Sequence, residues 1–402
     1  MDLEIINSKM REKFRKSREN MTGIFFYKAR KRERPRKLDD LSRLIEHRGD
    51  FCITAEDKKI FLQAFINKAQ VGNSKVFYKT GKESPITSIV IDGQVTNLDE
   101  INQAISAAPG NGDPGHCILK LIERRGHDAF RLIKGTYTML VYNDKEIYAA
   151  KDAIGHKPLY ILDTDDHVLI SSELKVFKES KEKPFILAPG TVYHGKGDSS
   201  EVVTFSSIEK LEKRSNDAPS LDSIKKNLFQ LLDRAVENSI QENPRFSALL
   251  SGGIDSSIVC ALATRYTDQL DAYTVYFKGS EDFNHAKLLA KEHEGAINHH
   301  LHEITLDDLL DVLPDVIYHL ETFDAALIRS ALPMYLVCSK IQEKKEILLT
   351  GEGADELFGG YSYLKQLKNL NSELVEMLKI EHATGLQRVD RIPYAFGIEA
   401  RA

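Results

Sequence analysis

Five residues in the stretch 249–257 have the types and the spacing of a phosphate-binding turn: Ser251, Gly252, Gly253, Asp255 and Ser256. An apolar run precedes them and apolar residues with helical spacing follow, which predicts a buried strand, a tight turn and a helix start. Glycines let the backbone approach a ligand, and the amides of a helix N-terminus attract anions. Because Asp255 would repel a phosphate chain unless a divalent cation lay between them, the turn predicts ATP with Mg²⁺. An ordinary glycine turn between a strand and a helix is the alternative interpretation.

A second turn rich in carboxylates follows the apolar run at 347–349 and contains Glu352, Asp355 and Glu356 among glycines. Three carboxylates this close need a cation or a proton to remain together. Acidic residues also stabilise the start of a helix through its dipole, and this alternative explains Asp355 and Glu356. It does not explain the glycines around Glu352, so we expect a functional loop.

Arg329 and a histidine-rich segment are weaker candidates. The guanidinium of Arg329, expected near the start of a helix, could reach phosphate oxygens, although a plain surface arginine fits the spacing equally well. In the segment 298–302, alternation places His300 and His302 on one face of a strand. No cysteine or carboxylate accompanies them with metal-ligand spacing, so we do not expect a metal site there.

The elements that must position the two turns alternate between strands and helices over residues 222–402. Such alternation predicts an α/β domain with a parallel sheet, whose ligands bind at the carboxyl ends of the strands. Both turns lie at such ends. We expect strands at 246–250, 272–277, 298–304 and 346–350, and helices at 222–240, 256–266, 283–293, 306–320 and 328–342.

Residues 21–205 have a different pattern, in which short β-rich runs are separated by turn dipeptides such as Asp92-Gly93 and Asn143-Asp144. This pattern predicts an antiparallel β-sandwich with some helix. We expect strands around 86–90, 136–142, 147–150, 159–162, 168–170 and 191–194, helices around 38–47 and 115–132, an N-terminal extension at 1–20 and a polar linker at 206–221.

Length and composition agree with two soluble domains: the chain has 402 residues, of which 42% are hydrophobic and 29% charged. The net charge is −5, with 13 Lys+Arg against 7 Asp+Glu in residues 1–40 and therefore −11 in the remainder. The basic cluster at 28–37 lacks interleaved aromatic residues, which favours a solvated face over a nucleic-acid partner. Four scattered cysteines, no apolar run of membrane length and no signal-peptide pattern predict a cytoplasmic protein without a membrane partner.

The two turns together resemble the asparagine synthetase family, and the resemblance extends over 21–402. Its most specific pieces are Leu249–Ser257, Glu321–Met334 and Thr350–Tyr361. The resemblance implies an α+β, Ntn-type glutaminase-like β-sandwich followed by an α/β parallel-sheet ATP-pyrophosphatase domain of the adenine nucleotide alpha hydrolase-like type. It also implies that ATP adenylates the carboxylate of aspartate, or of a related substrate, and that ammonia then forms the amide with release of AMP and pyrophosphate.

The resemblance further implies roles for individual residues, all of which remain expectations at this point. Glu352 would act as the base that takes a proton from ammonia, and Arg329 would steady the departing pyrophosphate. Asp255 and Asp355 would hold Mg²⁺. The pyrophosphate portion of ATP would contact Ser251, Gly252, Gly253 and Ser256, and the nucleotide would also contact Leu249, Val275, Thr350 and Gly351.

The N-terminal half departs from the family pattern at its catalytic positions. Thr22 stands where the family has a cysteine nucleophile, and 61–66 lacks the arginine that binds the glutamine carboxylate. Asp92-Gly93-Gln94 replaces Asn-Gly-Glu, and an aspartate beside a developing oxyanion would destabilise it. We therefore expect no glutamine hydrolysis, unless Thr22 becomes an N-terminal nucleophile after its amine is freed.

Two alternatives remain open. One is a β-lactam synthetase-like enzyme, in which an internal amine captures the adenylated carboxylate, and the other is a non-catalytic nucleotide-binding or regulatory relative. The sequence ends at Ala402, before the region in which the family has a phosphate-binding lysine, so a natural short form, a fragment and one of two complementing chains are all compatible with it. The expected partners are small-molecule substrates, and a homodimer is possible.

Overall fold

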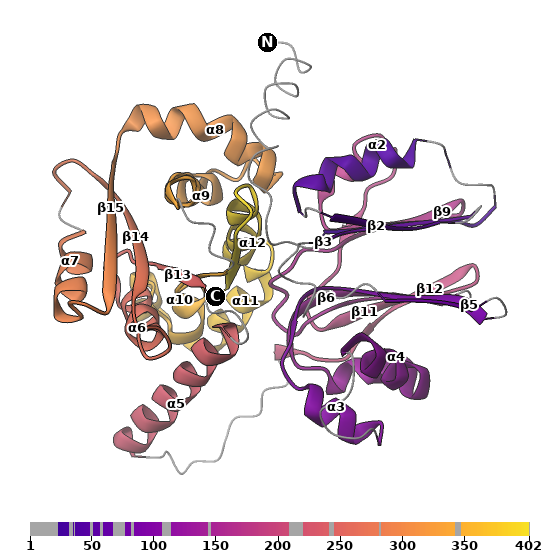
Figure 1. Cartoon of the computed structure of the whole chain (residues 1–402), viewed down its shortest axis with the longest axis horizontal. Coiled ribbons are helices and arrows are strands. Elements are labelled where there is room, and N and C mark those ends of the chain that lie inside the picture. The colour runs from indigo at the N-terminus through magenta and orange to yellow at the C-terminus, as the bar shows by residue number, and fades with distance from the viewer. Residues whose placement is uncertain are drawn as a thin grey trace. The chain divides into compact units, whose positions relative to one another are not determined.

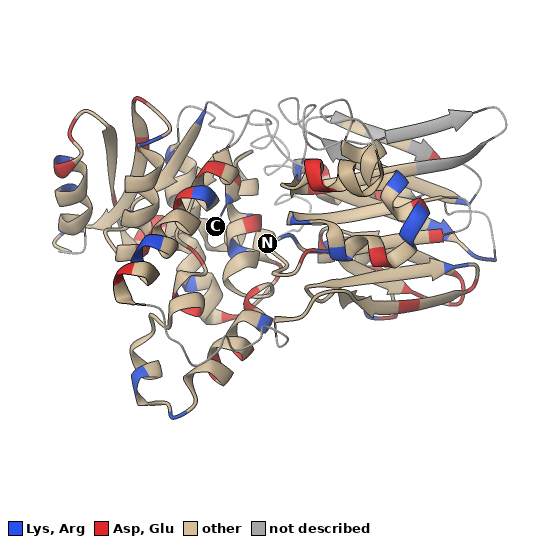
Figure 2. Cartoon of the chain, turned by 90° about the horizontal axis from the view of Figure 1, so that it is seen from below, with Lys and Arg blue, Asp and Glu red and all other residues tan. Residues whose placement is uncertain are grey.

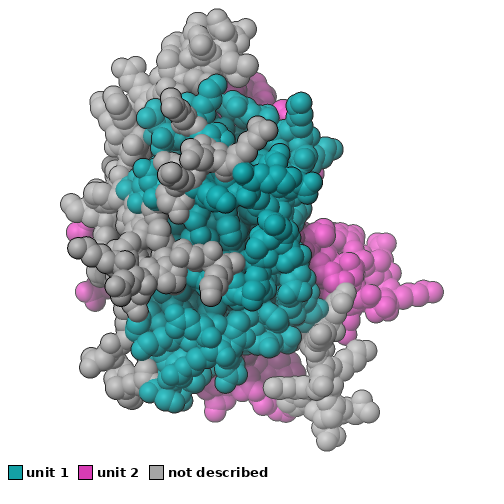
Figure 3. Space-filling model, turned by 90° about the vertical axis from the view of Figure 1, so that its right-hand side faces the viewer, with its two compact units in different colours: residues 1–208 teal, residues 209–402 magenta. Residues whose placement is uncertain are grey.

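The structure is a computed structural model that describes residues 23–31, 35, 37–48, 51–56, 59–66, 77–81, 84–106, 114–143, 146–208, 220–240, 245–280, 283–341 and 347–401. The chain divides into two compact units, residues 1–208 and 209–402, which are coloured separately in Figure 3. Thr22, the extension at 1–20 and most of the expected linker lie outside the described residues.

Unit 1 contains two antiparallel sheets, each of six strands within the described residues (Figure 1). The first has the order β10-β8-β9-β1-β3-β2 and the second β12-β11-β7-β6-β5-β4. The strands are β1 (Gly23–Ala29), β2 (Phe51–Glu56), β3 (Ile60–Ile66), β4 (Phe77–Gly81), β5 (Ser84–Val95), β6 (Gly135–Tyr142), β7 (Glu146–Lys151), β8 (Tyr160–Asp163), β9 (His167–Ser171), β10 (Phe185–Ile186), β11 (Thr191–Lys196) and β12 (Ser199–Thr204).

The two sheets of unit 1 pack face to face because alternate residues of their strands are apolar. Ile24 and Phe26 of β1 share one buried cluster with Val90 of β5 and Leu140 of β6. Helices cover the outer faces (Figure 1): α2 (Leu38–Ser42) and the 3-10 turns Arg43–Arg48 and Leu174–Phe177 on the first sheet, α3 (Leu98–Ala104), α4 (Pro114–Arg125) and the 3-10 turn η3 (Gly126–Leu132) on the second. The predicted sandwich is confirmed.

The prediction of a turn at Asp92-Gly93 is wrong. Both residues lie inside β5, where Asp92 is opposite Thr138 and Gly93 is opposite Tyr137 of β6. Gly93 has φ +115, and a Cβ atom there would meet the backbone of Thr136. The dipeptide therefore allows a close approach of two strands instead of reversing the chain, because continued pairing with β6 overrides its local turn preference.

Unit 2 contains a parallel sheet with the order β15-β14-β13-β16-β17 among the described residues. Its strands are β13 (Phe246–Leu249), β14 (Leu270–Phe277), β15 (Ile297–Ile304), β16 (Ile347–Leu349) and β17 (Glu399–Arg401). Its helices are α5 (Leu221–Ile240), α6 (Ile254–Ala263), α7 (Phe283–Glu292), α8 (Leu306–Leu320), α9 (Ala325–Lys340), α10 (Ala354–Phe358), α11 (Leu370–Glu381) and α12 (Gly385–Tyr394). The predicted parallel α/β sheet is confirmed.

Apolar residues cover both faces of this sheet. One buried cluster joins the sheet to α5, α6 and α7, and another joins it to α8, α9 and α12. β13 and β16 are neighbours in register, with Phe246 opposite Ile347. The carboxyl ends of both strands therefore lie at the same edge of the sheet, which brings the two glycine turns together.

The surface carries both signs of charge. Figure 2 shows basic and acidic residues interspersed along the ribbon of both units. Among the described helices, none combines the length and the apolar character needed to cross a membrane.

Candidate active site

The turn after β13 is shaped by its own serines. The hydroxyls of Ser251 and Ser256 lie 2.9 Å apart, and Ser256 also donates to the carbonyl of Gly253 at 3.2 Å. Gly252 has φ +87, a conformation that favours glycine. Gly253 precedes α6 without a side-chain cap, so the first amides of this helix are open to a ligand.

The turn after β16 lies directly against the first one. A Cβ atom on Gly351 would be 2.8 Å from the amide nitrogen of Ser256 and 2.9 Å from the carbonyl carbon of Asp255. Only a residue without a side chain permits this contact between two backbones. Gly353 then adopts the left-handed conformation at φ +84 that begins α10. These contacts explain the glycines around Glu352 that the helix-dipole interpretation left unexplained.

Both turns line one cavity of ≈ 290 Å³. Eight of the residues expected in the site lie on its wall: Leu249, Ser251, Asp255, Ser256, Thr350, Gly351, Glu352 and Asp355. Met334, Gly353, Glu356, Tyr361 and Arg388 complete the wall. The fold thus brings most of the expected site into one small volume.

Four expected residues are not on this wall. Gly252 and Gly253 belong to the first turn itself. Val275 is half-buried in β14 and packs against the same apolar cluster as Leu249. Arg329 is exposed in the second turn of α9, where its Nε atom donates to the carbonyl of Ala325 at 3.2 Å.

Negative charge accumulates at the second turn. Burial raises the pKa of Asp355, and the neighbouring Asp255, Glu356 and Glu352 raise it further. Burial likewise raises the pKa of Glu381, to about 7, with added effects of Glu356 and Glu352. Carboxylate oxygens are the ligands that Mg²⁺ prefers, so Asp255 and Asp355 fit this cation.

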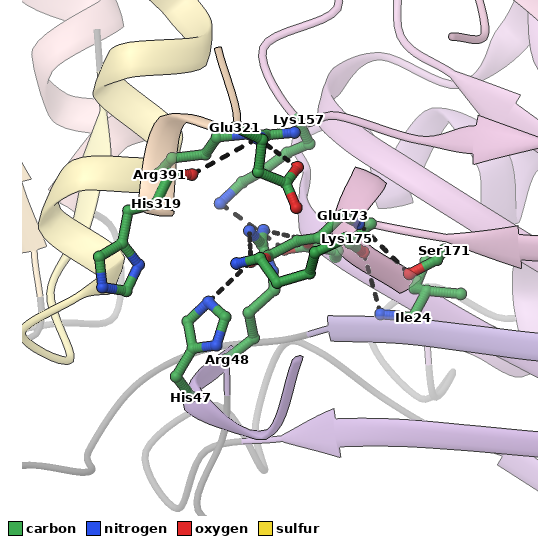
Figure 4. Close-up of polar contacts among 12 residues, drawn as sticks. Ile24, His47, Arg48, Lys157, Ser171, Glu173, Lys175, His319, Glu321 and Arg391 are labelled. Carbon is green, nitrogen blue, oxygen red and sulfur yellow. Dashed lines mark hydrogen bonds and ion pairs between the residues drawn. The ribbon is translucent and has the colours of Figure 1, made fainter. Parts of the chain in front are cut away.

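Arg388 in α12 is a member of the site that the sequence analysis missed. Its Nη2 atom donates to both carboxylate oxygens of Glu352. The same helix is fixed by Arg391, which donates to Glu321 and, at 2.9 Å, to the carbonyl of Leu320 at the end of α8 (Figure 4). No local sequence signal marks Arg388, because only the packing of α12 brings it to the second turn.

Unit 1 contains a buried ionic cluster around Arg48, which Figure 4 shows with His47, Lys157, Glu173 and Lys175. The guanidinium of Arg48 donates to Glu173 and to Asp92, each at 3.2 Å. Lys157 lies 3.6 Å from the other oxygen of Asp92.

Asp92 is the residue that we expected to destabilise a developing oxyanion. The carboxylate of Asp92 is fully buried and neutralised by two cations, and it belongs to the core of unit 1. A Cβ atom on Gly23 would lie 2.9 Å from the Cβ of Arg48, so the start of β1 rests against the same cluster. Burial acts to raise the pKa of Glu173, but His47, Lys175 and Arg48 outweigh it and hold that pKa well below its usual range.

The fold and the order of its two units define a class of protein: an amidotransferase-type sandwich followed by a synthase domain. The family model "Glutamine amidotransferase domain" matches residues 47–179, and the model "Asparagine synthase" matches residues 227–402. The glutamine-hydrolysing asparagine synthetase of Sandersonia aurantiaca is 30% identical over 378 residues, covering 89% of this chain and 68% of that protein. The chain belongs to the asparagine synthetase family.

Other relatives agree with this assignment. Asparagine synthetase 3 of Arabidopsis thaliana is 27% identical, covering 91% of this chain and 65% of its own length. The chain thus spans about two thirds of the length of these curated relatives. A solved glutamine phosphoribosylpyrophosphate amidotransferase from B. subtilis aligns with 61% of this chain and 64% of its own at 18% identity and a TM-score of 0.37, a likeness from which nothing further follows.

Proposed function

We propose that this protein is an ATP-dependent carbon–nitrogen ligase that adenylates aspartate, or a related carboxylate, and forms an amide with ammonia. The contact of Gly351 with the backbone of Asp255 and Ser256 is the observation that supports this most directly. It joins an uncapped helix start, suited to phosphate, to a group of carboxylates suited to a cation.

The first step would be formation of an acyl–AMP. A substrate carboxylate oxygen attacks the α-phosphorus of ATP, and the bond to pyrophosphate breaks. The amides at the start of α6, with Ser251 and Ser256, would hold the pyrophosphate portion, and Leu249, Val275, Thr350 and Gly351 would contact the nucleotide. Asp255 and Asp355 would hold Mg²⁺, which supplies neutralisation of the phosphate charge when bound.

In the second step the nitrogen of ammonia attacks the acyl carbon, AMP leaves, and one proton passes from nitrogen to a base. Glu352 would be that base, and Arg388 would keep both of its oxygens in place. Arg329 would steady pyrophosphate after rotating away from its own helix backbone. This proposal is open to test because Arg329 is exposed and can be replaced without disturbing the core.

The nitrogen source we propose is free ammonia, not glutamine. Asp92 stands where the resemblance implies the oxyanion asparagine and is fixed by Arg48 and Lys157, and the arginine expected to bind a glutamine carboxylate is missing from 61–66. The four cysteines are scattered along the sequence without CxxC spacing, which suits a reducing cytosol, where we propose that the protein acts. Light scattering would establish whether it is a homodimer.

The decisive assay supplies ATP, Mg²⁺ and aspartate with either ammonia or glutamine and measures pyrophosphate and asparagine. Asparagine formed with ammonia but not with glutamine is the expected result. Pyrophosphate release only with another carboxylate would favour β-lactam synthetase-like chemistry. Binding of ATP without any pyrophosphate release would favour a regulatory relative and contradict the proposal.

A further inference from the structure

Two histidines and a glutamate converge in unit 1, away from the ionic cluster around Arg48. His127 lies in η3, His194 in β11 and Glu201 in β12. Each offers one ligand atom, and these atoms all lie within 4.8 Å of one another. We propose that His127, His194 and Glu201 form a binding site for a transition-metal cation of the zinc type.

Strand register builds this site. His194 is directly opposite Glu201 on β12 and opposite Tyr148 on β7. Directly opposite residues of antiparallel strands point to the same face. The side chains of Tyr148, His194 and Glu201 therefore form one row across the sheet. His127, from η3, reaches the same row, and its ring centroid is 6.2 Å from that of His194.

The ring of His194 is held in one orientation. It stacks on Tyr148 with centroids 4.5 Å apart and planes inclined by only 4°. Its Nδ1 atom lies 3.5 Å from a carboxylate oxygen of Glu201. Its Nε2 atom is buried and has no hydrogen-bond partner among the described residues. A fixed, largely buried imidazole is already oriented for coordination.

Glu146 completes the arrangement from the far side of the ring. One of its oxygens lies 3.7 Å from Nε2 of His194, while Lys196 and Tyr148 bind the same carboxylate at 2.8 Å each. At 3.7 Å the two groups make no hydrogen bond, but the nearby carboxylate favours a proton on Nε2, which would leave the other nitrogen, Nδ1, for the metal. Glu146 is therefore assigned as the positioning residue that leaves Nδ1 facing the cation.

The chemistry of the donors selects the metal. Two imidazoles and one carboxylate suit Zn²⁺ or Co²⁺, whereas Mg²⁺ and Ca²⁺ prefer oxygen ligands alone. Bonds of about 2.0–2.2 Å to a tetrahedral zinc require the ligand atoms to close to roughly 3.5 Å, a change that side-chain rotation can supply because Glu201 is exposed. A bound cation would tie η3 to the β11–β12 hairpin.

A charged imidazolium between two carboxylates is the competing explanation. In that case His194 would pair with Glu146 and Glu201, near Lys196 and His127, and no metal would bind. The 402-residue chain, freed of metal by chelation, should be titrated with Zn²⁺ by calorimetry and with Co²⁺ by visible absorption. Excess Mg²⁺ keeps the acidic turn of unit 2 occupied throughout.

We expect one equivalent of Zn²⁺ to bind and to raise the Tm of the wild type. Glu201→Gln and His127→Gln should weaken binding by at least about tenfold, and Glu146→Gln by about 10–100-fold. The control is Glu179→Gln, which alters another exposed glutamate of unit 1 and should bind as the wild type does. Absence of zinc binding by the wild type, or unchanged affinity in Glu201→Gln, would overturn the proposal.

Discussion

Arg388 binds both carboxylate oxygens of Glu352, although the two residues are 36 positions apart in the chain. The ion pair is mostly buried, since the side chains of Arg388 and Glu352 are 15% and 19% exposed. A paired, partly desolvated carboxylate keeps one orientation, which a base or a hydrogen-bond acceptor in a reaction needs. The pair therefore links α12 to the acidic turn and to the cavity that both turns line.

Replacing Arg388 should affect turnover more than nucleotide binding. Arg388→Ala frees Glu352 to rotate, and we expect kcat to fall by about 10–100-fold with a smaller change in the KM for ATP. Arg388→Lys should recover part of the loss because it restores the charge without the fork-shaped geometry. Steady-state pyrophosphate release measures both constants. An equal rise of KM in Arg388→Ala and Arg388→Lys, with kcat unchanged in both, would contradict the positioning role.

Asp255→Asn should abolish the use of Mg²⁺-ATP while leaving the fold intact. Loss of one carboxylate from the proposed cation site would remove several kcal/mol of charge stabilisation, so pyrophosphate release should fall by about a hundredfold or more. Asp268→Asn, at an exposed position beyond α6, serves as the matched control. Circular dichroism should be unchanged in both variants. An Asp255→Asn protein with normal Mg²⁺ dependence would refute the assigned site.

Gly351→Ala should destabilise unit 2. The new Cβ atom would lie 2.8 Å from the backbone of Ser256, so the two turns must separate, at a cost of about 1–3 kcal/mol. Gly253→Ala is the comparison, since its Cβ atom would meet only the Ser251 hydroxyl at 3.5 Å. Thermal unfolding should show a lowered Tm for Gly351→Ala alone, and equal Tm values would argue against backbone contact of the turns.

Stability should depend on pH through Glu381, whose pKa is raised from 4.5 to about 7 by burial and then by Glu356 and Glu352. Between these values the folded chain holds a proton that the unfolded chain releases, so stability falls as pH rises from about 4.5 through 7. Glu381→Gln, which mimics the protonated acid, should raise Tm at pH 8 and change it little at pH 4.5.

The measurement for Glu381 is a Tm series across this pH range without Mg²⁺. Glu376→Gln, on the exposed side of α11, is the control and should keep the pH dependence of the wild type. A Glu381→Gln protein whose Tm falls with pH as steeply as that of the wild type would exclude Glu381 as the titrating group.

Asp92→Asn introduces the residue type that the resemblance to the family implies at this position, but we expect it to cost stability instead of activating glutamine hydrolysis. The change removes the negative charge that Arg48 and Lys157 share in the core, at a cost of about 3 kcal/mol. Denaturant unfolding of the variant checks the stability. Release of glutamate from glutamine should stay absent in the wild type and in the variant, and its appearance in either would contradict the interpretation.

Much of the fold was readable from the sequence because the deciding signals are local. Alternating strand and helix patterns gave the parallel sheet of unit 2, and the helix predicted at 306–320 matches α8. The glycine turns were recognisable because a strand, a turn and a helix start occupy only a few successive residues. The same locality caused the error at Asp92-Gly93, since a dipeptide carries no information about the strand that pairs with it.

The sequence by itself determined a β-rich half and an α/β half, a phosphate-binding turn and an acidic turn. Tertiary structure alone decided that Gly351 touches the first turn, that Arg388 holds Glu352, and that Asp92 is buried between two cations. It also decided that His127, His194 and Glu201 meet, whereas the sequence drew attention to the histidines at 298–302. Such contacts depend on strand register and helix packing between distant segments, which no local pattern of residue types specifies.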